Sequence, residues 1–183
     1  MRAPQAIKDR LALLDVVHAR GARVAVEIGT YAGEYAEAIL QRTGVDVLYC
    51  VDPWAGTGMR QNWDGDEMYA RVRTRLAPYG NRVILWRMTS MEAAEVLARR
   101  ELDSSSDCTL FDFIYIDGLH DYVHAREDAA TWRHFVREGG ILAGHDYKDL
   151  GRRKQVKRAV AEVFPTGVNV TGEACPSWWR AME

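Results

Sequence analysis

The 183-residue chain lacks the features of a secreted or membrane-embedded protein. Its three cysteines, Cys50, Cys108 and Cys175, are odd in number and have no metal-ligand spacing, so they predict free thiols in a reducing compartment. No apolar run approaches the ~20 residues that cross a bilayer. The amino-terminal stretch MRAPQAIKDR lacks the apolar segment of a signal peptide. These absences predict a cytoplasmic protein with no membrane partner.

The chain also lacks a large excess of charge of either sign. Its 24 Lys and Arg residues nearly balance 26 Asp and Glu residues, which leaves a formal net charge of −2. Such a balance provides no electrostatic reason to expect a nucleic-acid partner. There is no internal repeat or low-complexity tract, and the length suits one domain with a substantial core.

The sequence does contain a regular alternation of helix and strand patterns. Residues 5–20 carry apolar side chains at helical spacing, whereas 23–29 and 46–52 are short apolar runs typical of buried strands. Alternating elements of this kind predict an α/β fold, with a parallel sheet covered by helices on both faces. Further helices are expected at 33–43, 68–76, 91–100, 125–136 and from 156, further strands at 82–86, 111–116 and 139–146, and two short closing strands at 167–171 and 177–182.

Two of these strands end on a group of His and Asp residues. The segment FDFIYIDGLHDY (111–122) runs from apolar residues into Asp117 and His120, and GGILAGHDY ends with His145 and Asp146 before its tyrosine. In sheets of this class, ligands bind beyond the carboxyl ends of the strands. We therefore expect the two groups to open onto the same crevice.

The turn after the first strand, in VEIGTYAG, lies at the same edge. Gly29 and Gly33 would let backbone N–H groups approach a ligand, and the following helix N-terminus favours an anionic group. Tyr31 stands where a dinucleotide fingerprint needs glycine, which leaves less room for a pyrophosphate. Asp52 ends the second strand, where a carboxylate can accept both hydroxyls of a ribose. Together these residues predict a nucleoside-type cofactor.

Four motifs in this order, VEIGTYAG, VDPW, FDFIYIDGLHDY and GGILAGHDY, resemble those of class I S-adenosylmethionine-dependent methyltransferases. The similarity spans about residues 20–165 and is greatest to the small O-methyltransferase branch with IDG-x-H and HDY-like strand ends. It implies a Rossmann-like, seven-stranded, mostly parallel sheet, which the two closing strands fit. It also implies one methyltransferase domain over 1–183, with an N-terminal helix at 1–20 and a closing β-hairpin at 165–183.

The resemblance further implies S-adenosylmethionine as the cofactor and a set of contacts to it. Glu27 and Gly29 would line its methionine part, and Asp52 would hold its ribose. Asp117 would lie near the sulfonium and the substrate. The complete implied set is Glu27, Gly29, Thr30, Tyr31, Gly33, Asp52, Pro53, Trp54, Thr89, Ser90 and Asp117, of which Thr89 and Ser90 fall where the family contacts adenine.

Metal-dependent, catechol-type relatives hold a divalent ion at the ends of strands four and five. The matching residues here are Asp117, Asp146 and His145. Two carboxylates suit Mg²⁺, while a histidine favours Mn²⁺, Fe²⁺ or Zn²⁺. Asp117 and Asp146 are equally consistent with direct contacts to cofactor or substrate without a metal. His145 is also consistent with contacting a metal ligand rather than the metal itself. The same relatives place a general base three residues after the strand-four Asp, which is His120 here. The catalytic residues expected are therefore His120, Asp117 and His145.

These features favour O-methylation of a small hydroxylated acceptor, such as a sugar or a phenolic natural product, and leave room for a homo-oligomer. One alternative is a metal-dependent hydrolase built on the His/Asp groups, which leaves Asp52 and the glycine turn without a role. Another is a non-catalytic module that only binds S-adenosylmethionine. Binding of S-adenosylmethionine separates the hydrolase from the other two, and turnover separates those two.

Overall fold

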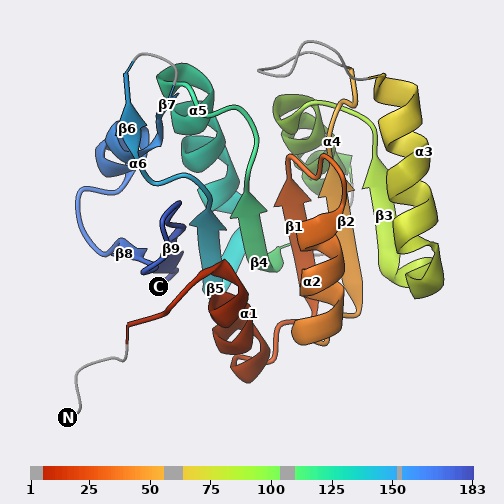
Figure 1. The fold of residues 1–183 in the computed structure, drawn as a ribbon, viewed down its shortest axis with the longest axis horizontal. Coiled ribbons are helices and arrows are strands. Elements are labelled where there is room, and N and C mark those ends of the chain that lie inside the picture. Colours follow the sequence, from red (N-terminus) through yellow and green to blue (C-terminus); the bar gives the residue numbers. More distant parts are fainter. Residues whose placement is uncertain (1–5, 56–63, 104–109, 152–153) are drawn as a thin grey trace.

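The computed structural model describes residues 6–55, 64–103, 110–151 and 154–183, and it contains the predicted alternation of helices and strands (Figure 1). The helices are α1 (Arg10–Ala19), α2 (Glu34–Arg42), α3 (Gly65–Leu76), α4 (Ser90–Asp103), α5 (Tyr122–Trp132) and α6 (Val156–Val163), with short 3₁₀ turns at Ala77–Arg82 and Arg133–Phe135. The strands are β1 (Val24–Ile28), β2 (Val47–Val51), β3 (Val83–Trp86), β4 (Phe111–Ile116), β5 (Val136–Gly144), β6 (Asp149–Leu150), β7 (Lys154–Gln155), β8 (Asn169–Val170) and β9 (Trp178–Ala181).

Seven of these strands form one sheet in the order β3-β2-β1-β4-β5-β9-β8. Strands β1 to β5 are parallel, whereas β9 runs antiparallel to β5 and β8 antiparallel to β9. The predicted Rossmann-like, seven-stranded, mostly parallel sheet is therefore confirmed. The strand order reverses direction after β1, because β2 and β3 lie on one side of it and β4 and β5 on the other. That reversal is where ligands of open α/β sheets bind.

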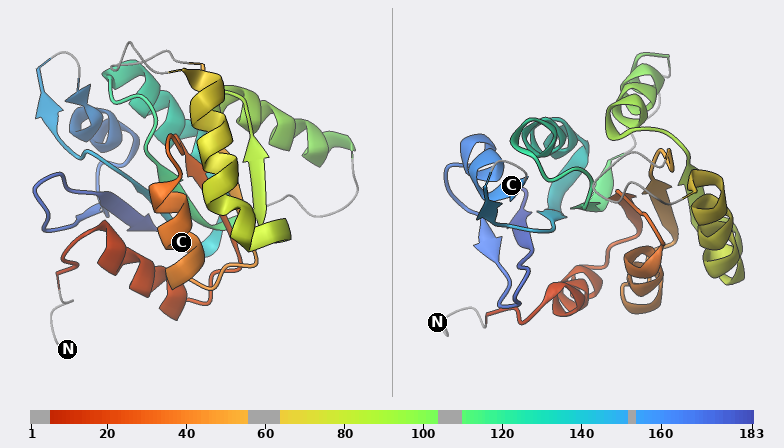
Figure 2. Two further views of the ribbon diagram at one scale, coloured as in Figure 1. Left: turned by 45° about the vertical axis from the view of Figure 1, so that its right-hand side comes forward. Right: turned by 45° about the horizontal axis from the view of Figure 1, so that its top comes forward.

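Helices cover both faces of the sheet (Figures 1 and 2). Side chains alternate between the faces along each strand, so Ala25 packs with α1, α2 and α3 while Val26 packs with α4, α5 and α6. Trp178 and Trp179, adjacent on β9, likewise join opposite core clusters. The sheet therefore has little exposed apolar surface at its centre, and polar groups concentrate at its edges. No helix in the described ranges is long and apolar enough to span a membrane.

Three elements differ from the expected boundaries. Helix α1 begins at Arg10 rather than near residue 5, because the Asp9 carboxylate accepts a hydrogen bond from Ala12 N (2.8 Å) and caps the helix there. Helix α6 begins at Val156, as expected, because residues 154–155 pair with β6 as a strand. The helix after β4 ends at Trp132, and β5 starts earlier than expected, at Val136.

Candidate functional site

The polar residues predicted from the strand ends do meet at one edge of the sheet. Glu27 lies level with Cys50 of β2 and Tyr115 of β4 in the parallel register, and Asp52 and Asp117 directly follow those strands. The right-hand view of Figure 2 turns this edge toward the reader. The carboxyl ends of β1, β2, β4 and β5 thus enclose the candidate site.

Gly29 holds the β1–α2 turn against the end of β4. Its φ is +86°, and a Cβ at this position would lie 2.2 Å from the carbonyl oxygen of Asp117. The absence of a side chain therefore allows the β1–α2 turn to contact the backbone at the end of β4, which places the turn beside Asp117. Gly33 caps α2 with φ +75°, and a Cβ there would meet Val72 and Arg75 of α3.

Asp52 is tied to the same turn. Its two carboxylate oxygens accept hydrogen bonds from Tyr31 N (2.9 Å) and Trp54 N (2.7 Å). Burial raises the pKa of Asp52, and these two bonds partly oppose that rise. A carboxylate has about four acceptor positions, so Asp52 retains capacity for the hydroxyls of a ribose. Trp54 is fully buried and donates its indole N–H to Tyr31 O (2.8 Å), while Pro53 is exposed.

The segment after β3 is fixed by internal hydrogen bonds. Thr89 and Glu92 form a reciprocal cap on α4, with Thr89 N and Oγ1 each 2.8 Å from Glu92 Oε2. Ser90 Oγ accepts a hydrogen bond from Trp132 Nε1 (2.8 Å) and donates one to Asp128. Burial raises the pKa of Asp128 to about 6, although the bond from Ser90 lowers it. Both hydroxyls are thus engaged within the protein, beside the place where adenine is expected.

Two buried polar atoms near the turn have no hydrogen-bond partner among the described residues. They are Glu27 Oε2 and Thr30 Oγ1, on side chains that belong to residues only 2% and 4% exposed. Burial raises the pKa of Glu27 well above its ordinary value, and the nearby Thr30 hydroxyl opposes that rise only in part. An unpaired buried polar group costs about 1–3 kcal/mol, so a ligand that supplies the missing donor would bind favourably. This is the strongest local indication that the residues present suit a bound polar molecule.

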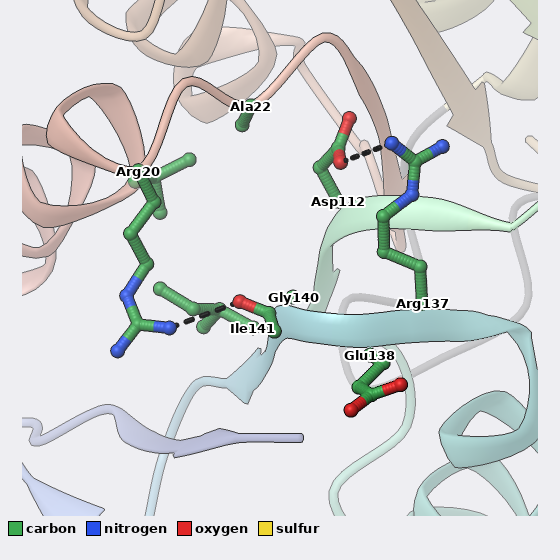
Figure 3. A pocket seen from close by; sticks show the side chains of 9 residues that line it. Arg20, Ala22, Asp112, Arg137, Glu138, Gly140 and Ile141 are labelled. Carbon is green, nitrogen blue, oxygen red and sulfur yellow. Dashed lines mark hydrogen bonds and ion pairs between the residues drawn. The ribbon is translucent and has the colours of Figure 1, made fainter. Parts of the chain in front are cut away.

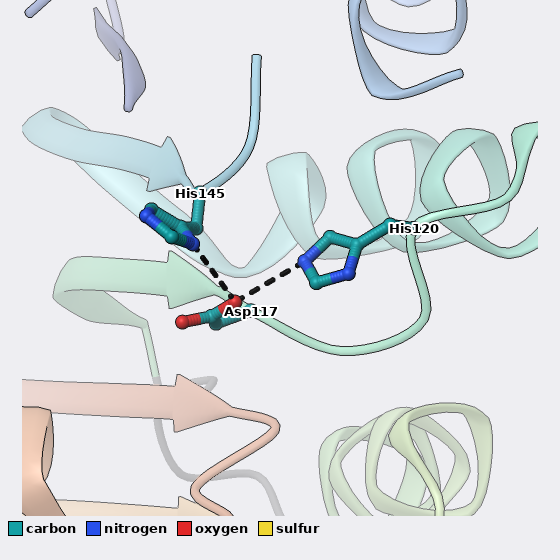
Figure 4. A group of neighbouring side chains, drawn as sticks. All are labelled: Asp117, His120 and His145. Atoms are coloured by element: carbon teal, nitrogen blue, oxygen red, sulfur yellow. Dashed lines mark hydrogen bonds and ion pairs between the residues drawn. The ribbon is translucent and has the colours of Figure 1, made fainter. Parts of the chain in front are cut away.

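Three side chains converge where β4 and β5 end (Figure 4). His120 Nε2 lies 3.2 Å from Asp117 Oδ1, and His145 Nδ1 lies 3.4 Å from the same oxygen. Burial opposes ionisation of Asp117, but the hydrogen bonds from His120 and His145 outweigh it and hold its pKa well below the ordinary carboxyl value. The buried carboxylate of Asp146, on a residue with φ +53°, lies 3.6 Å from His120 Nε2.

The ligand atoms of Asp117, His120 and His145 all lie within 4.8 Å of one another. Two ligand atoms bound tetrahedrally to one ion at ~2.1 Å stand about 3.4 Å apart. His120 Nε2 and His145 Nδ1 lie at similar distances, 3.2 and 3.4 Å, from Asp117 Oδ1, so this trio suits a transition metal. The trio contains His120 in place of the expected Asp146. Asp121, the other acid of the IDGLHD segment, lies outside it and caps α5 by accepting from Val123 N (3.1 Å) and His124 N (3.3 Å).

Two further residues of the site escaped the sequence motifs. Arg10, at the start of α1, places Nη1 3.4 Å from Asp117 Oδ2. No local pattern distinguishes this arginine from others in the chain, because only the docking of α1 brings it to the strand ends. The burial of Asp128 could have been predicted from the sequence, since it shares one helix face with the apolar residues Ala125, Ala129 and Trp132.

A hollow at the opposite edge of the sheet is a weaker candidate (Figure 3). Three of its charged side chains are already engaged, because Arg137 Nη1 lies 2.9 Å from Asp112 Oδ1 and Arg20 Nη1 donates to Gly139 O at 2.9 Å. Asp112 also accepts from the main-chain N–H groups of Arg23 and Val24. These interactions join α1, β4 and β5, and they occupy Arg20, Asp112 and Arg137 within the protein.

A family model described as a methyltransferase domain matches residues 26–147, more than half of the chain. The matched span runs from Val26, within β1, past the end of β5, and it contains every strand-end residue described above. The protein therefore belongs to this family of methyltransferase domains, as the four sequence motifs indicated. One curated relative, an uncharacterized protein of Acanthamoeba polyphaga mimivirus, is 25% identical over 138 residues, which is 75% of this chain; the chain spans 58% of that protein's length.

Solved methyltransferase structures share the fold. The N-methyltransferase NodS from Bradyrhizobium japonicum aligns with a TM-score of 0.63 at 15% identity, over 95% of each chain. An O-methyltransferase from Bacillus cereus in complex with SAH gives 0.65 at 15% identity, over 91% of this chain and 77% of that one. TomG, an O-methyltransferase from Streptomyces achromogenes in complex with SAM, gives 0.64 at 15% identity, over 93% and 78%. The likeness establishes a class I methyltransferase fold, and it includes both N- and O-methyltransferases.

Proposed function

We propose that this protein is an S-adenosylmethionine-dependent O-methyltransferase that acts on a hydroxyl group of a small molecule. The observation that carries the proposal is the arrangement of His120. Its Nε2 faces Asp117 at 3.2 Å and Asp146 at 3.6 Å. Nδ1 has no hydrogen-bond partner within the described ranges. An imidazole held in this way can accept a proton at Nδ1 while a carboxylate stabilises the charge at Nε2.

The residues present suit the proposed cofactor. The unpaired Glu27 Oε2 would accept hydrogen bonds from the methionine ammonium, and Asp52 would accept them from the ribose hydroxyls. The segment at Thr89 and Ser90 would border the adenine. When bound, S-adenosylmethionine supplies a methyl group on a positively charged sulfur, which an oxygen nucleophile can displace. The protein's task is then to align the acceptor and to remove its proton.

His120 would take the acceptor's hydroxyl proton at Nδ1, and Asp117 would hold the resulting imidazolium through Nε2–H. An amine acceptor needs less help with its proton, so a buried Asp–His pair favours oxygen over nitrogen. The fold alone makes no such distinction, because both kinds of enzyme share it.

A second form of the proposal includes a divalent ion at Asp117, His120 and His145, which the geometry of their ligand atoms favours. Such an ion would lower the pKa of a bound hydroxyl. The two forms need different tautomers of His120, because an ion requires the lone pair of Nε2 and a base at Nδ1 requires Nε2–H. Membership of a methyltransferase family disfavours the metal-dependent hydrolase.

The test is methyl transfer from labelled S-adenosylmethionine to a panel of hydroxylated sugars, phenols and matched amines. We expect product only with hydroxyl acceptors. Product confined to amines would refute O-methylation, and cofactor binding without turnover on any acceptor would favour the non-catalytic module. A cytoplasmic location and self-association stay predictions from the sequence.

A further inference from the structure

Arg10 brings a permanent positive charge into the candidate site from outside the matched residues 26–147. Its Nη1 lies 3.4 Å from Asp117 Oδ2, and its Cζ lies 5.0 Å from the centre of the Tyr35 ring. The side chain keeps 32% of its surface exposed. It therefore borders the crevice and remains open to a ligand.

The main chain of Arg10 is anchored independently of its side chain. Tyr35 donates its hydroxyl to Arg10 O (3.1 Å), and Arg10 N donates to Glu173 Oε1 (2.8 Å). These bonds tie the start of α1 to α2 and to the segment before β9. Because they involve only backbone atoms of Arg10, a substitution of its side chain leaves them in place.

An unpaired acid lies in the same charged group. Glu27 Oε2 is buried without a partner in the described ranges. Burial raises the pKa of Glu27 well above its ordinary value, and the nearby charge of Arg10 opposes that rise only in part. The site thus presents a cation and, close by, a buried acid whose Oε2 has no hydrogen-bond partner in the described ranges. An entering ammonium group would favour the ionised form of this acid. A zwitterionic α-amino-acid group needs this combination, since it carries an ammonium and a carboxylate on one carbon.

We propose that Arg10 binds the α-carboxylate of the methionine part of S-adenosylmethionine, opposite the ammonium held by Glu27. The inference rests on the proposed function. A guanidinium has five N–H donors in a planar fork that matches a carboxylate. Its approach to Asp117, at 3.4 Å, and its hydrogen bond to the Tyr115 hydroxyl occupy only part of these donors and leave others for a second acid.

Three ligands separate the contributions in calorimetric titrations. S-adenosylmethionine carries both charged groups, its decarboxylated form keeps only the ammonium, and 5′-methylthioadenosine lacks both. Arg10→Gln should weaken binding of S-adenosylmethionine by about 10- to 100-fold, the value of hydrogen bonds between charged groups. The affinities for the other two ligands should stay unchanged. Arg10→Lys, which keeps the charge but loses the fork, should weaken binding of S-adenosylmethionine less. Glu27→Gln should weaken both ammonium-bearing ligands and spare 5′-methylthioadenosine.

Arg20→Ala is the matched control, because it removes an arginine just after the same helix, at the opposite edge of the sheet. It should leave all three affinities unchanged. Thermal unfolding of each variant verifies that it is folded. Equal weakening of all three ligands by Arg10→Gln, or no effect on S-adenosylmethionine, would overturn the inference. An effect confined to the KM of an acidic acceptor would also overturn it and assign Arg10 to that acceptor. A wild-type protein that binds none of the ligands would instead refute the proposed function itself.

Discussion

Replacing Asp128 by asparagine should remove a pH-dependent cost from the folded state. Burial raises the pKa of Asp128 from 3.8 to about 6. The folded protein therefore keeps this proton at pH values where the unfolded chain has already released it. The stability that this retained proton gives the folded protein is fully present below pH ~3.8 and is lost as pH rises through ~6. The full loss, for about 2.2 pH units at 1.36 kcal/mol each, is about 3 kcal/mol.

About half of that loss, ~1.4 kcal/mol, should develop between pH 5 and pH 8. Asparagine stays neutral, so the unfolding free energy of Asp128→Asn relative to wild type should rise by this amount over the same interval. Urea unfolding of both proteins at the two pH values measures it. The comparison between the two pH values removes any pH-independent effect of the amide on the unfolding free energy. It also removes the titration of groups that both proteins share. A stability difference that is independent of pH, or that falls as pH rises, would refute the assignment of a proton to buried Asp128.

Other consequences concern the catalytic group and the turn. His120→Ala should lower kcat by about 10²–10⁴-fold while affinity for S-adenosylhomocysteine is retained; weakened affinity with kcat intact would make His120 a structural residue. If an ion assists, activity should fall with a chelator and return with Mg²⁺ or Mn²⁺, and full activity of metal-free protein would exclude that form of the proposal. Gly29→Ala, whose Cβ would lie 2.2 Å from Asp117 O, should lower the unfolding free energy by about 2–5 kcal/mol. Gly21→Ala, with φ +71° and nothing within 4 Å, should cost only about 1–2 kcal/mol, and equal costs would contradict the steric role of Gly29.

The sequence pattern was sufficient to predict which residues lie at the strand ends. The spacing and length of the apolar runs identify buried parallel strands, and the carboxyl ends of such strands lie at one edge of the sheet. The sequence pattern alone therefore places Glu27, Asp52 and Asp117 together. The reason for Gly29 could not be found in this way. Its contact is with the backbone of Asp117, 88 positions away in the chain, and a turn pattern contains no information about such a neighbour.

Side-chain partners were the least predictable part of the site. The place of Thr89 and Ser90 beside adenine stays a prediction. Their hydroxyls bond to Glu92 and Asp128, partners that the sequence motifs did not indicate. The convergence of His120 and His145 on one oxygen of Asp117 depends on the relative height of β4 and β5, which periodicity does not specify.

The claim that the protein binds S-adenosylmethionine at the strand ends is tested most directly by calorimetric titration with S-adenosylhomocysteine. Wild type should bind it, and Asp52→Asn should weaken binding by about 1.5–3 kcal/mol, since the ribose would lose hydrogen bonds to a charged acceptor. Asparagine keeps one oxygen to accept from Tyr31 N or Trp54 N, which limits disturbance of the turn. Absence of binding heat with folded wild-type protein, at several temperatures, or an Asp52→Asn variant that binds as tightly as wild type, would contradict the account.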